Sequence, residues 1–85
     1  MPKTIFTGAN QVVVDAVREA RLRAGLTQGE VAARIGRDQS HISLIEGSQR
    51  RLDLVEFNRL AEAIGADPVV LFAEISRRLR EAERR

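Results

Sequence analysis

The sequence predicts an all-α fold of five helices, and three features of the chain support this. Capping residues precede the apolar stretches, glycines follow them, and apolar residues recur every three or four positions. No stretch alternates apolar and polar residues in the manner of a strand, and neither Asn-Gly nor Asp-Gly occurs. With 85 residues, the chain is expected to form one domain over 1–85, with a core at about 12–75 and a helical extension at 76–85.

The first two helices follow from an apolar stripe and a capping pattern. A first helix is expected over 9–24, with Gly25 after it and an apolar stripe made of Val13, Val14, Val17, Ala20 and Leu22. Thr27 and Glu30 have the spacing of a capping box, in which each side chain bonds the other's backbone N–H. The second helix therefore starts after Thr27, and Gly36 ends it.

The remaining three helices each follow an aspartate. Asp38 caps a third helix with Ile42 and Ile45 inward, and the chain leaves it at Gly47 and Ser48. A fourth helix is expected from Leu54 to Ile64, after Asp53 and before Gly65. The fifth begins at the Asp67-Pro68 pair, with proline in its first turn, and could continue to the end of the chain.

Composition excludes several kinds of site. The chain has no cysteine and a single histidine, so neither a disulfide nor a metal site is expected. No ligand-binding domain fits in this length, and we expect no cofactor and no small-molecule ligand. No apolar run is long enough for a membrane span, and the N-terminus does not have the pattern of a signal peptide. A cytoplasmic location is therefore expected.

Charge is unevenly distributed along the chain. The net charge is only +2, but residues 18–51 carry seven Arg against four acids, and residues 75–85 carry five Arg against two. Residues 52–74 hold one Arg against five acids. Two basic segments suggest an anionic partner for one face. The acidic segment is either a solvated face or a surface for a basic partner.

The most informative stretch is Leu26–Glu46. Two short helices meet there at a turn of about three residues, with small Ala32 at their contact and Gly36 where the chain reverses. This is the layout of a DNA-binding helix-turn-helix, whose second helix enters the major groove. Expected base contacts come from the outer face of the third helix, namely Gln39, Ser40, His41, Ser43 and Leu44. Expected phosphate contacts come from Gln28, Arg37, Arg50 and Arg51.

Simpler interpretations of these residues remain open. The two-helix pattern could serve packing alone, and the arginines could be ordinary solvated side chains. Asp38, Ser40, His41 and Ser43 include the residue types of a hydrolase. They lie on one short exposed helix without a second element to orient them, so no enzymatic activity is expected.

As a set, these motifs resemble the Cro/C1-type (XRE-like) helix-turn-helix proteins, which include phage repressors and restriction–modification controller proteins. The matching residues are Gly25–Gln28, Ala32, Gly36, Gln39-Ser40, Ile42-Ser43, Ile45-Glu46, Leu60–Gly65 and Asp67-Pro68. The resemblance implies a five-helix bundle of the lambda-repressor-like type, a bacterial or phage origin, and operator binding as a homodimer. It also implies that Gln28 supports the recognition helix and that Arg21 pairs with Glu46.

The fifth helix carries the predicted dimer interface. Phe72, Ile75 and Leu79 are spaced three and four residues apart, as in a short coiled coil. We expect that nothing within the domain covers Leu79 and that a second copy does, with Leu71 and Val69 partly buried below. The alternative is that Phe72 and Ile75 complete the core of the monomer and that residues 77–85 fray.

The sequence thus predicts a sequence-specific regulator of transcription that binds double-stranded DNA. A homodimeric repressor, possibly of its own promoter, would occupy a palindromic operator. Two other functions stay open: an antitoxin whose C-terminal segment binds a toxin protein, and a controller protein that also activates transcription by contacting RNA polymerase through Glu30. An adaptor that keeps only the fold is less consistent with the uncharged outer face of the third helix.

Overall fold

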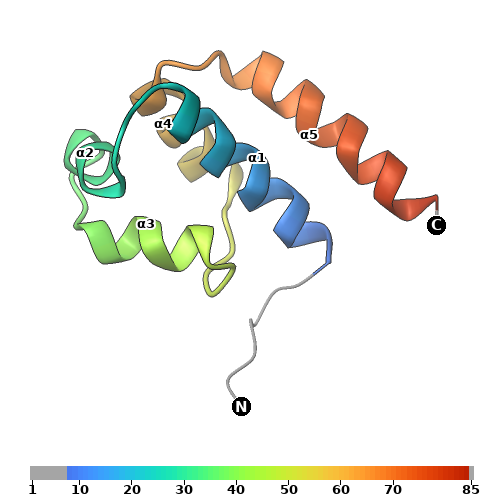
Figure 1. Ribbon diagram of the computed structural model, residues 1–85, viewed down its shortest axis with the longest axis horizontal. Helices are drawn as coiled ribbons and strands as arrows, with labels where there is room; N and C mark the ends of the chain where they lie inside the picture. The colour runs from blue at the N-terminus through green and yellow to red at the C-terminus, as the bar shows by residue number, and fades with distance from the viewer. Residues whose placement is uncertain (1–7, 85) are drawn as a thin grey trace.

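The computed structural model describes residues 8–84, and within that range the secondary structure is entirely helical. Five helices follow one another along the chain (Figure 1): α1 (Ala9–Arg23), α2 (Gln28–Arg34), α3 (Gln39–Glu46), α4 (Leu54–Ile64) and α5 (Pro68–Glu83). The predicted all-α class is confirmed. The two helix ranges predicted from sequence agree with α1 and α4 to within one residue.

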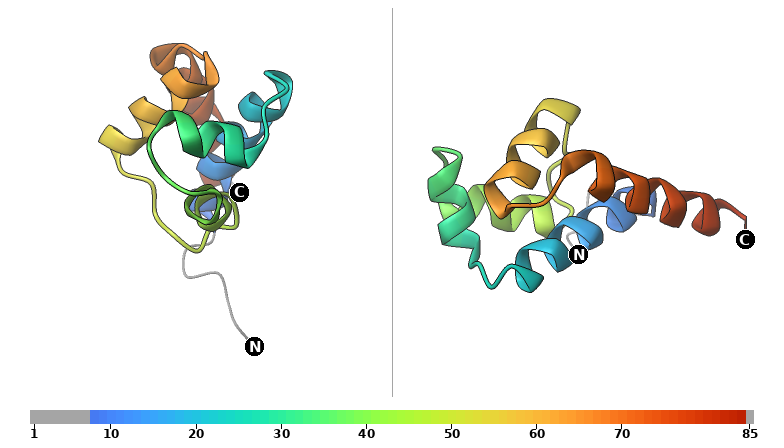
Figure 2. Two further views of the ribbon diagram at one scale, coloured as in Figure 1. Left: turned by 90° about the vertical axis from the view of Figure 1, so that its left-hand side faces the viewer. Right: turned by 90° about the horizontal axis from the view of Figure 1, so that it is seen from above.

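All five helices contribute to one apolar core. α2 and α3 pack as a pair, and α5 runs alongside α1 (Figures 1 and 2). The buried apolar side chains are Val14, Ala16, Val17, Ala20, Val31, Ala32, Ile42, Ile45, Phe57, Leu60, Ala61, Ile64, Leu71 and Ile75. The C-terminal end of α5 projects beyond the other helices (Figure 2).

Local capping explains where the helices begin. The Thr27 hydroxyl accepts a hydrogen bond from the Glu30 backbone N–H at 3.0 Å, and Glu30 Oε1 accepts one from the Thr27 N–H at 2.8 Å. This is the predicted capping box. Asp38, Asp53 and Asp67 cap α3, α4 and α5 as predicted, each accepting a backbone N–H of the first turn.

The turns before and after α3 share one backbone conformation, a residue with positive φ, although the residue differs between them. Between α2 and α3, Gly36 takes a positive φ of 71°, and the Arg37 N–H donates to the Ala32 carbonyl at 2.9 Å. After α3, Ser48 takes the corresponding position with φ of 59°, which a side chain disfavours. Ser48 is fully buried, and its hydroxyl accepts a 2.8 Å hydrogen bond from Asn10. This bond ties the end of α3 to the start of α1.

Two expectations about α5 are wrong. Leu79 does not lack a cover within its own chain, because α5 lies along α1 and Leu79 packs partly buried against the core. Val69, expected to be partly buried, is 77% exposed. Ile75 is 1% exposed and belongs to the core of the monomer, as the alternative interpretation held, whereas Phe72 is 47% exposed. The frayed end in that alternative is also wrong, since α5 continues to Glu83.

Ion pairs fasten α5 to α1. Arg78 lies 2.9 Å from Glu19 of α1 and 2.7 Å from Glu74 of its own helix, between guanidinium nitrogen and carboxylate oxygen. Hydrogen bonds from Arg77 and Arg78 lower the pKa of Glu74 to about 2. Two of the arginines in the basic segment 75–85 are therefore occupied within the chain.

The acidic segment 52–74 is largely used for folding. Asp53 and Asp67 are helix caps, Glu74 pairs with arginines, and Glu56 contacts a side chain of α3. These internal contacts leave fewer of its carboxylates for a basic partner, and they also show that the segment is more than a solvated face.

Candidate nucleic-acid interface

α3 lies at one edge of the molecule (Figure 1), and its outward face is largely polar. Ile42 and Ile45 point into the core, and the helical period places Ser40 and Ser43 on the opposite side. Gln39 and Leu44 lie on the two flanks of this outer face. All four of these outer residues are exposed, and Leu44 is 48% exposed. An exposed helix of this kind has the dimensions that the major groove of DNA admits.

The amide of Gln39 is held by a chain of hydrogen bonds. Gln39 Nε2 donates to Gln28 Oε1 at 2.6 Å, and Gln28 Nε2 donates to Glu46 Oε1 at 3.0 Å. Gln28 comes from the first turn of α2, so it links the start of α3 to the end of α3. The support of the recognition helix by Gln28, implied by the resemblance, is thus present as a direct contact.

The predicted ion pair of Arg21 with Glu46 is present and buried. Arg21 Nε lies 2.6 Å from Glu46 Oε2, and a second guanidinium nitrogen donates to Oε1 at 2.8 Å. The Arg21 guanidinium also donates to the Leu26 carbonyl at 2.8 Å. Burial would raise the pKa of Glu46, but hydrogen bonds from Arg21 and Gln28 outweigh burial and lower it. The pair joins α1 to the end of α3 and so fixes the position of α3 relative to α1.

His41 does not lie on the outer face of α3, so the geometry does not favour its predicted contact with a base, which stays a prediction. Its side chain is 12% exposed, and its Nε2 lies 2.5 Å from Glu56 Oε2 of α4. The physical reason is the helical period: His41 lies four residues before Ile45 and therefore shares the side of α3 that packs against the rest of the domain.

Glu56 is the residue of this region that sequence reasoning missed. The spacing Asp53-x-x-Glu56 is that of a capping box, which would turn the carboxylate towards the Asp53 backbone. Asp53 does accept the Glu56 N–H at 2.7 Å, but the Glu56 side chain turns to His41 instead. The one available signal was His41 itself, because a histidine that is partly buried on α3 requires a polar partner.

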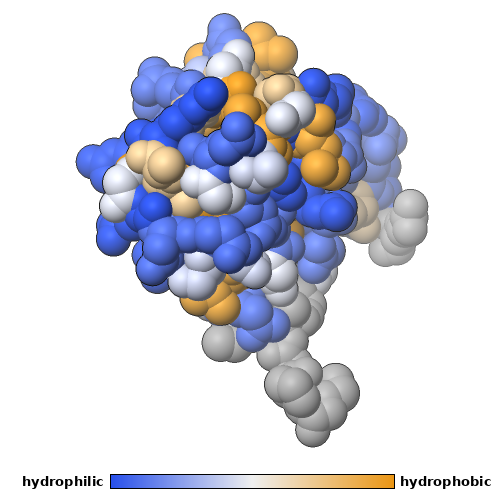
Figure 3. Space-filling model, turned by 60° about the vertical axis from the view of Figure 1, so that its left-hand side comes forward, coloured by the Kyte–Doolittle hydropathy of each residue, from blue (hydrophilic) through white to orange (hydrophobic). Residues whose placement is uncertain are grey.

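The arginines predicted to contact phosphates lie at both ends of α3. Arg37 is exposed in the turn before it, and Arg50 and Arg51 are exposed in the connection to α4. Arg50 Nε is 3.8 Å from Glu56 Oε1. The face of the molecule that brings α2 forward is mostly hydrophilic, with separate hydrophobic areas (Figure 3).

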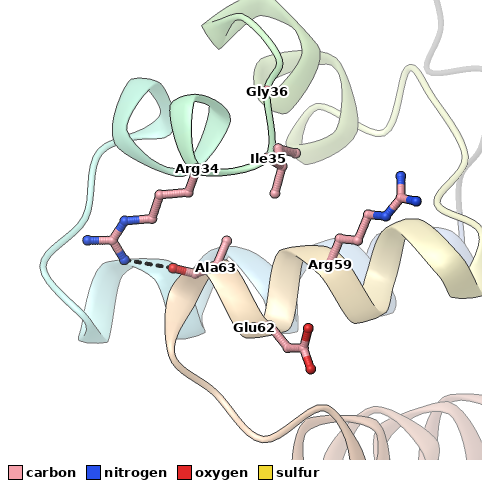
Figure 4. A pocket seen from close by; sticks show the side chains of 6 residues that line it. All are labelled: Arg34, Ile35, Gly36, Arg59, Glu62 and Ala63. Carbon is pink, nitrogen blue, oxygen red and sulfur yellow. Dashed lines mark hydrogen bonds between the residues drawn. The ribbon is translucent and has the colours of Figure 1, made fainter.

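A second concave region, between α2 and α4, is occupied by a packing contact. A guanidinium nitrogen of Arg34 donates to the Ala63 carbonyl at 2.7 Å, which satisfies a carbonyl in the last turn of α4. Figure 4 shows that the polar ends of Arg34, Arg59 and Glu62 point in three different directions. These groups do not converge on a common ligand position, and the candidate interface remains the α3 face.

Comparisons with known proteins agree with this geometry. A family model described as "Helix-turn-helix domain" matches residues 13–75. The chain belongs to this helix-turn-helix family. Within the family it is of the Cro/C1-type (XRE-like) class of DNA-binding regulators. No curated protein sequence matches the chain.

Solved helix-turn-helix structures are similar over most of the chain. An XRE-family like protein from Pseudomonas syringae pv. tomato str. DC3000 is 44% identical, with 80% of this chain and 83% of that chain covered and a TM-score of 0.76. The restriction-modification controller protein C.AhdI from Aeromonas hydrophila is 32% identical, with 73% and 90% covered and a TM-score of 0.67. The controller protein C.Esp1396I, as a tetramer in complex with its natural 35 base-pair operator, is 23% identical, with 87% and 97% covered and a TM-score of 0.78; this likeness shows the fold alone.

The residues of this helix-turn-helix that could suggest hydrolysis have other partners. The Ser40 hydroxyl donates to the Asp38 carboxylate at 2.7 Å, and His41 contacts Glu56. Ser40 and His41 are thus not arranged as nucleophile and base. Across residues 8–84, no group of three His, Cys, Asp or Glu could hold a metal ion, and no helix is long and apolar enough to cross a membrane.

Proposed function

We propose that the protein is a sequence-specific regulator of transcription that binds a palindromic operator as a homodimer. The carrying observation is the α3 face, where Gln39 is held in a defined orientation by Gln28. A side chain that is already oriented loses less conformational entropy when it binds, and its amide can pair with only one arrangement of base-edge groups.

Each residue of the interface has a proposed role. Gln39 pairs with an adenine edge, Ser40 and Ser43 donate or accept at base edges, and Leu44 contacts a thymine methyl group. Phosphate contacts come from residues at the two ends of α3, namely Gln28, Arg37, Arg50 and Arg51. The phosphate contacts supply salt-sensitive affinity, and the base contacts supply the choice of sequence.

The proposed dimer interface is an apolar groove between α4 and α5. Its walls are lined by Leu54, Phe57, Asn58, Pro68, Val69 and Phe72. Leu54 and Val69 are 75% and 77% exposed, which is unfavourable in water without a cover. Phe72 packs edge-on against Phe57 with ring centres 6.3 Å apart, so it presents a rigid apolar surface.

The proposed interface differs from the seam predicted from sequence. Phe72 remains central, Ile75 is left out because it is buried within the monomer, and Leu79 is left out because it packs against the core and does not line the groove. A twofold axis through the groove would relate two copies of α3. Two such helices about 34 Å apart would read half-sites one turn of DNA apart.

Repression by occupying a promoter, in the cytoplasm, is the simplest mode of action for a protein of this size. A controller protein that also activates transcription is the second candidate, favoured by the 32% identity to C.AhdI over 73% of this chain. The antitoxin alternative is not favoured, because α5 is fastened along α1 by Arg78 and Glu19 and is not free to wrap a toxin protein.

Selection of random duplex DNA by the purified protein tests the proposal. A symmetric motif with half-sites about one turn apart is expected. Gln39→Ala with Ser43→Ala is expected to abolish the preference for that motif and to leave salt-sensitive non-specific binding. Ser76→Ala on α5 is the control and should keep the preference. Full discrimination by the double variant would overturn the α3 assignment.

A further inference from the structure

The carboxylate of Glu56 lies between the recognition helix and a cation predicted to contact DNA. Its side chain is only 13% exposed. One oxygen, Oε2, is 2.5 Å from His41 Nε2 on α3, and the other, Oε1, is 3.8 Å from Arg50 Nε in the connection between α3 and α4. Glu56 therefore links α3, the α3–α4 connection and α4 through polar side chains.

We propose that Glu56 is a specificity-determining residue of the interface, acting as a positioning residue through Arg50. This inference rests on the proposed function of DNA binding. Arg50 is 48% exposed and has the Glu56 carboxylate as an internal competitor for any DNA phosphate. When the bases of an operator fit the α3 face, a backbone phosphate lies within reach of Arg50 in the position that Glu56 gives it. Phosphates of unrelated DNA lie elsewhere, so Arg50 must move away from Glu56 to contact them.

His41 fixes the position of the competing carboxylate. An ionised carboxylate only accepts hydrogen bonds, so the His41 N–H is the donor to Oε2. His41 belongs to α3, and it positions the Glu56 carboxylate that attracts Arg50. The position of Arg50 is therefore coupled to that of the base-reading face. The charge of Glu56 thus lowers affinity for all DNA but lowers it least for DNA that fits both α3 and Arg50.

Glu56→Gln separates the charge from the hydrogen bond. The amide oxygen can still accept from His41, while the attraction for Arg50 is lost. Binding to the selected motif and to a scrambled duplex is measured over a series of salt concentrations. Scrambled DNA is expected to bind more tightly, with the salt slope steeper by up to about one unit, and the ratio of specific to non-specific affinity is expected to fall by about threefold.

Glu62→Gln is the matched control, because it removes the same charge from the same helix. Glu62 lines the region between α2 and α4, where Arg34 lies, and its carboxylate points away from Arg34 (Figure 4). It should change both affinities slightly and equally. Glu56→Asp keeps the charge but draws the carboxylate back from Arg50, so it should also weaken discrimination without a change in net charge.

Arg50→Ala completes the test as a double-variant cycle. In an Arg50→Ala background, Glu56→Gln should no longer change the ratio of specific to non-specific affinity. Thermal unfolding of each variant shows that it is folded under the binding conditions. If Glu56→Gln matches Glu62→Gln and Glu56→Asp matches the wild type, the inference is overturned while operator binding stands. If the wild-type protein selects no motif, the proposed function itself fails.

Discussion

The two surfaces proposed to function in this protein are built in opposite ways. On the α3 face, Gln39 is already oriented by a hydrogen bond to Gln28, which is held in turn by the buried Glu46. In the α4–α5 groove, apolar side chains such as Leu54 and Val69 stand exposed. The first surface is oriented within one copy of the chain, whereas the proposed dimer surface would be completed by a second copy.

The difference follows from the physics of the two kinds of contact. Base edges are recognised by directional hydrogen bonds, and a misaligned amide gains little, so orientation must be set beforehand. Burial of apolar surface is non-directional and scales with area, so the groove needs only shape and a cover. A single domain can therefore carry an ordered polar surface beside an unfinished apolar one.

Breaking the Arg21–Glu46 pair should have the largest effect of the changes considered, because it should lower stability and disturb the polar surface together. Glu46→Ala leaves the buried Arg21 charge without its partner and should lower the free energy of unfolding by about 3 kcal/mol. Gln28 also loses its acceptor, so operator preference should weaken. Urea denaturation measures the loss. Arg21→Met combined with Glu46→Leu should recover much of the stability but not the preference.

A loss of stability below about 1 kcal/mol in Glu46→Ala would contradict this expectation, because breaking an exposed ion pair costs no more than that. The α3 face would then be oriented by packing alone.

Phe72→Glu should have the next largest effect, confined to the groove. A buried carboxylate in the dimer interface should weaken the dimer at least about tenfold, which sedimentation equilibrium measures. Val70→Glu is the matched control: Val70 is 66% exposed on the same helix but does not line the groove. Equal dissociation constants for the two variants would move the interface elsewhere on the molecule.

Of the changes considered, acidification from neutral pH should have the smallest effect on the stability of the fold. It should act through the polar contacts only. The pKa values of Glu19, Glu46 and Glu74 are lowered in the folded state, that of Glu74 to about 2. Folding then stabilises the charged forms, so their contribution is complete above the ordinary glutamate value of 4.5 and is lost as the pH falls through the lowered values. Thermal unfolding across this interval should show a falling midpoint.

Glu74→Gln provides the control for the acid effect. Its midpoint should change less between pH 4.5 and about 2 than that of the wild type, and added salt should reduce the difference because this carboxylate is exposed. A wild-type midpoint that stays constant over the interval would show that the α1–α5 ion pairs do not contribute to stability.

Local features of the sequence determined the helices and their ends. The capping box of Thr27 and Glu30, the three aspartate caps and Gly36 all act through hydrogen bonds within about five residues. Such bonds are encoded by residue type and spacing, which is why the bounds of α4 were predictable. The outer position of Gln39, Ser40, Ser43 and Leu44 followed in the same way from the helical period and the inward Ile42 and Ile45.

Only the tertiary structure decided which side chains at the borders of the helix faces are buried and which are exposed. His41 lies at the border of the buried side of α3, and its direction depends on Glu56, fifteen residues away on a helix whose packing no local signal specifies. Leu79 looked uncovered because the sequence does not show that α5 runs along α1. Short-range hydrogen bonds determined the elements, whereas side-chain packing between distant helices determined which faces remain available to DNA and to a second copy.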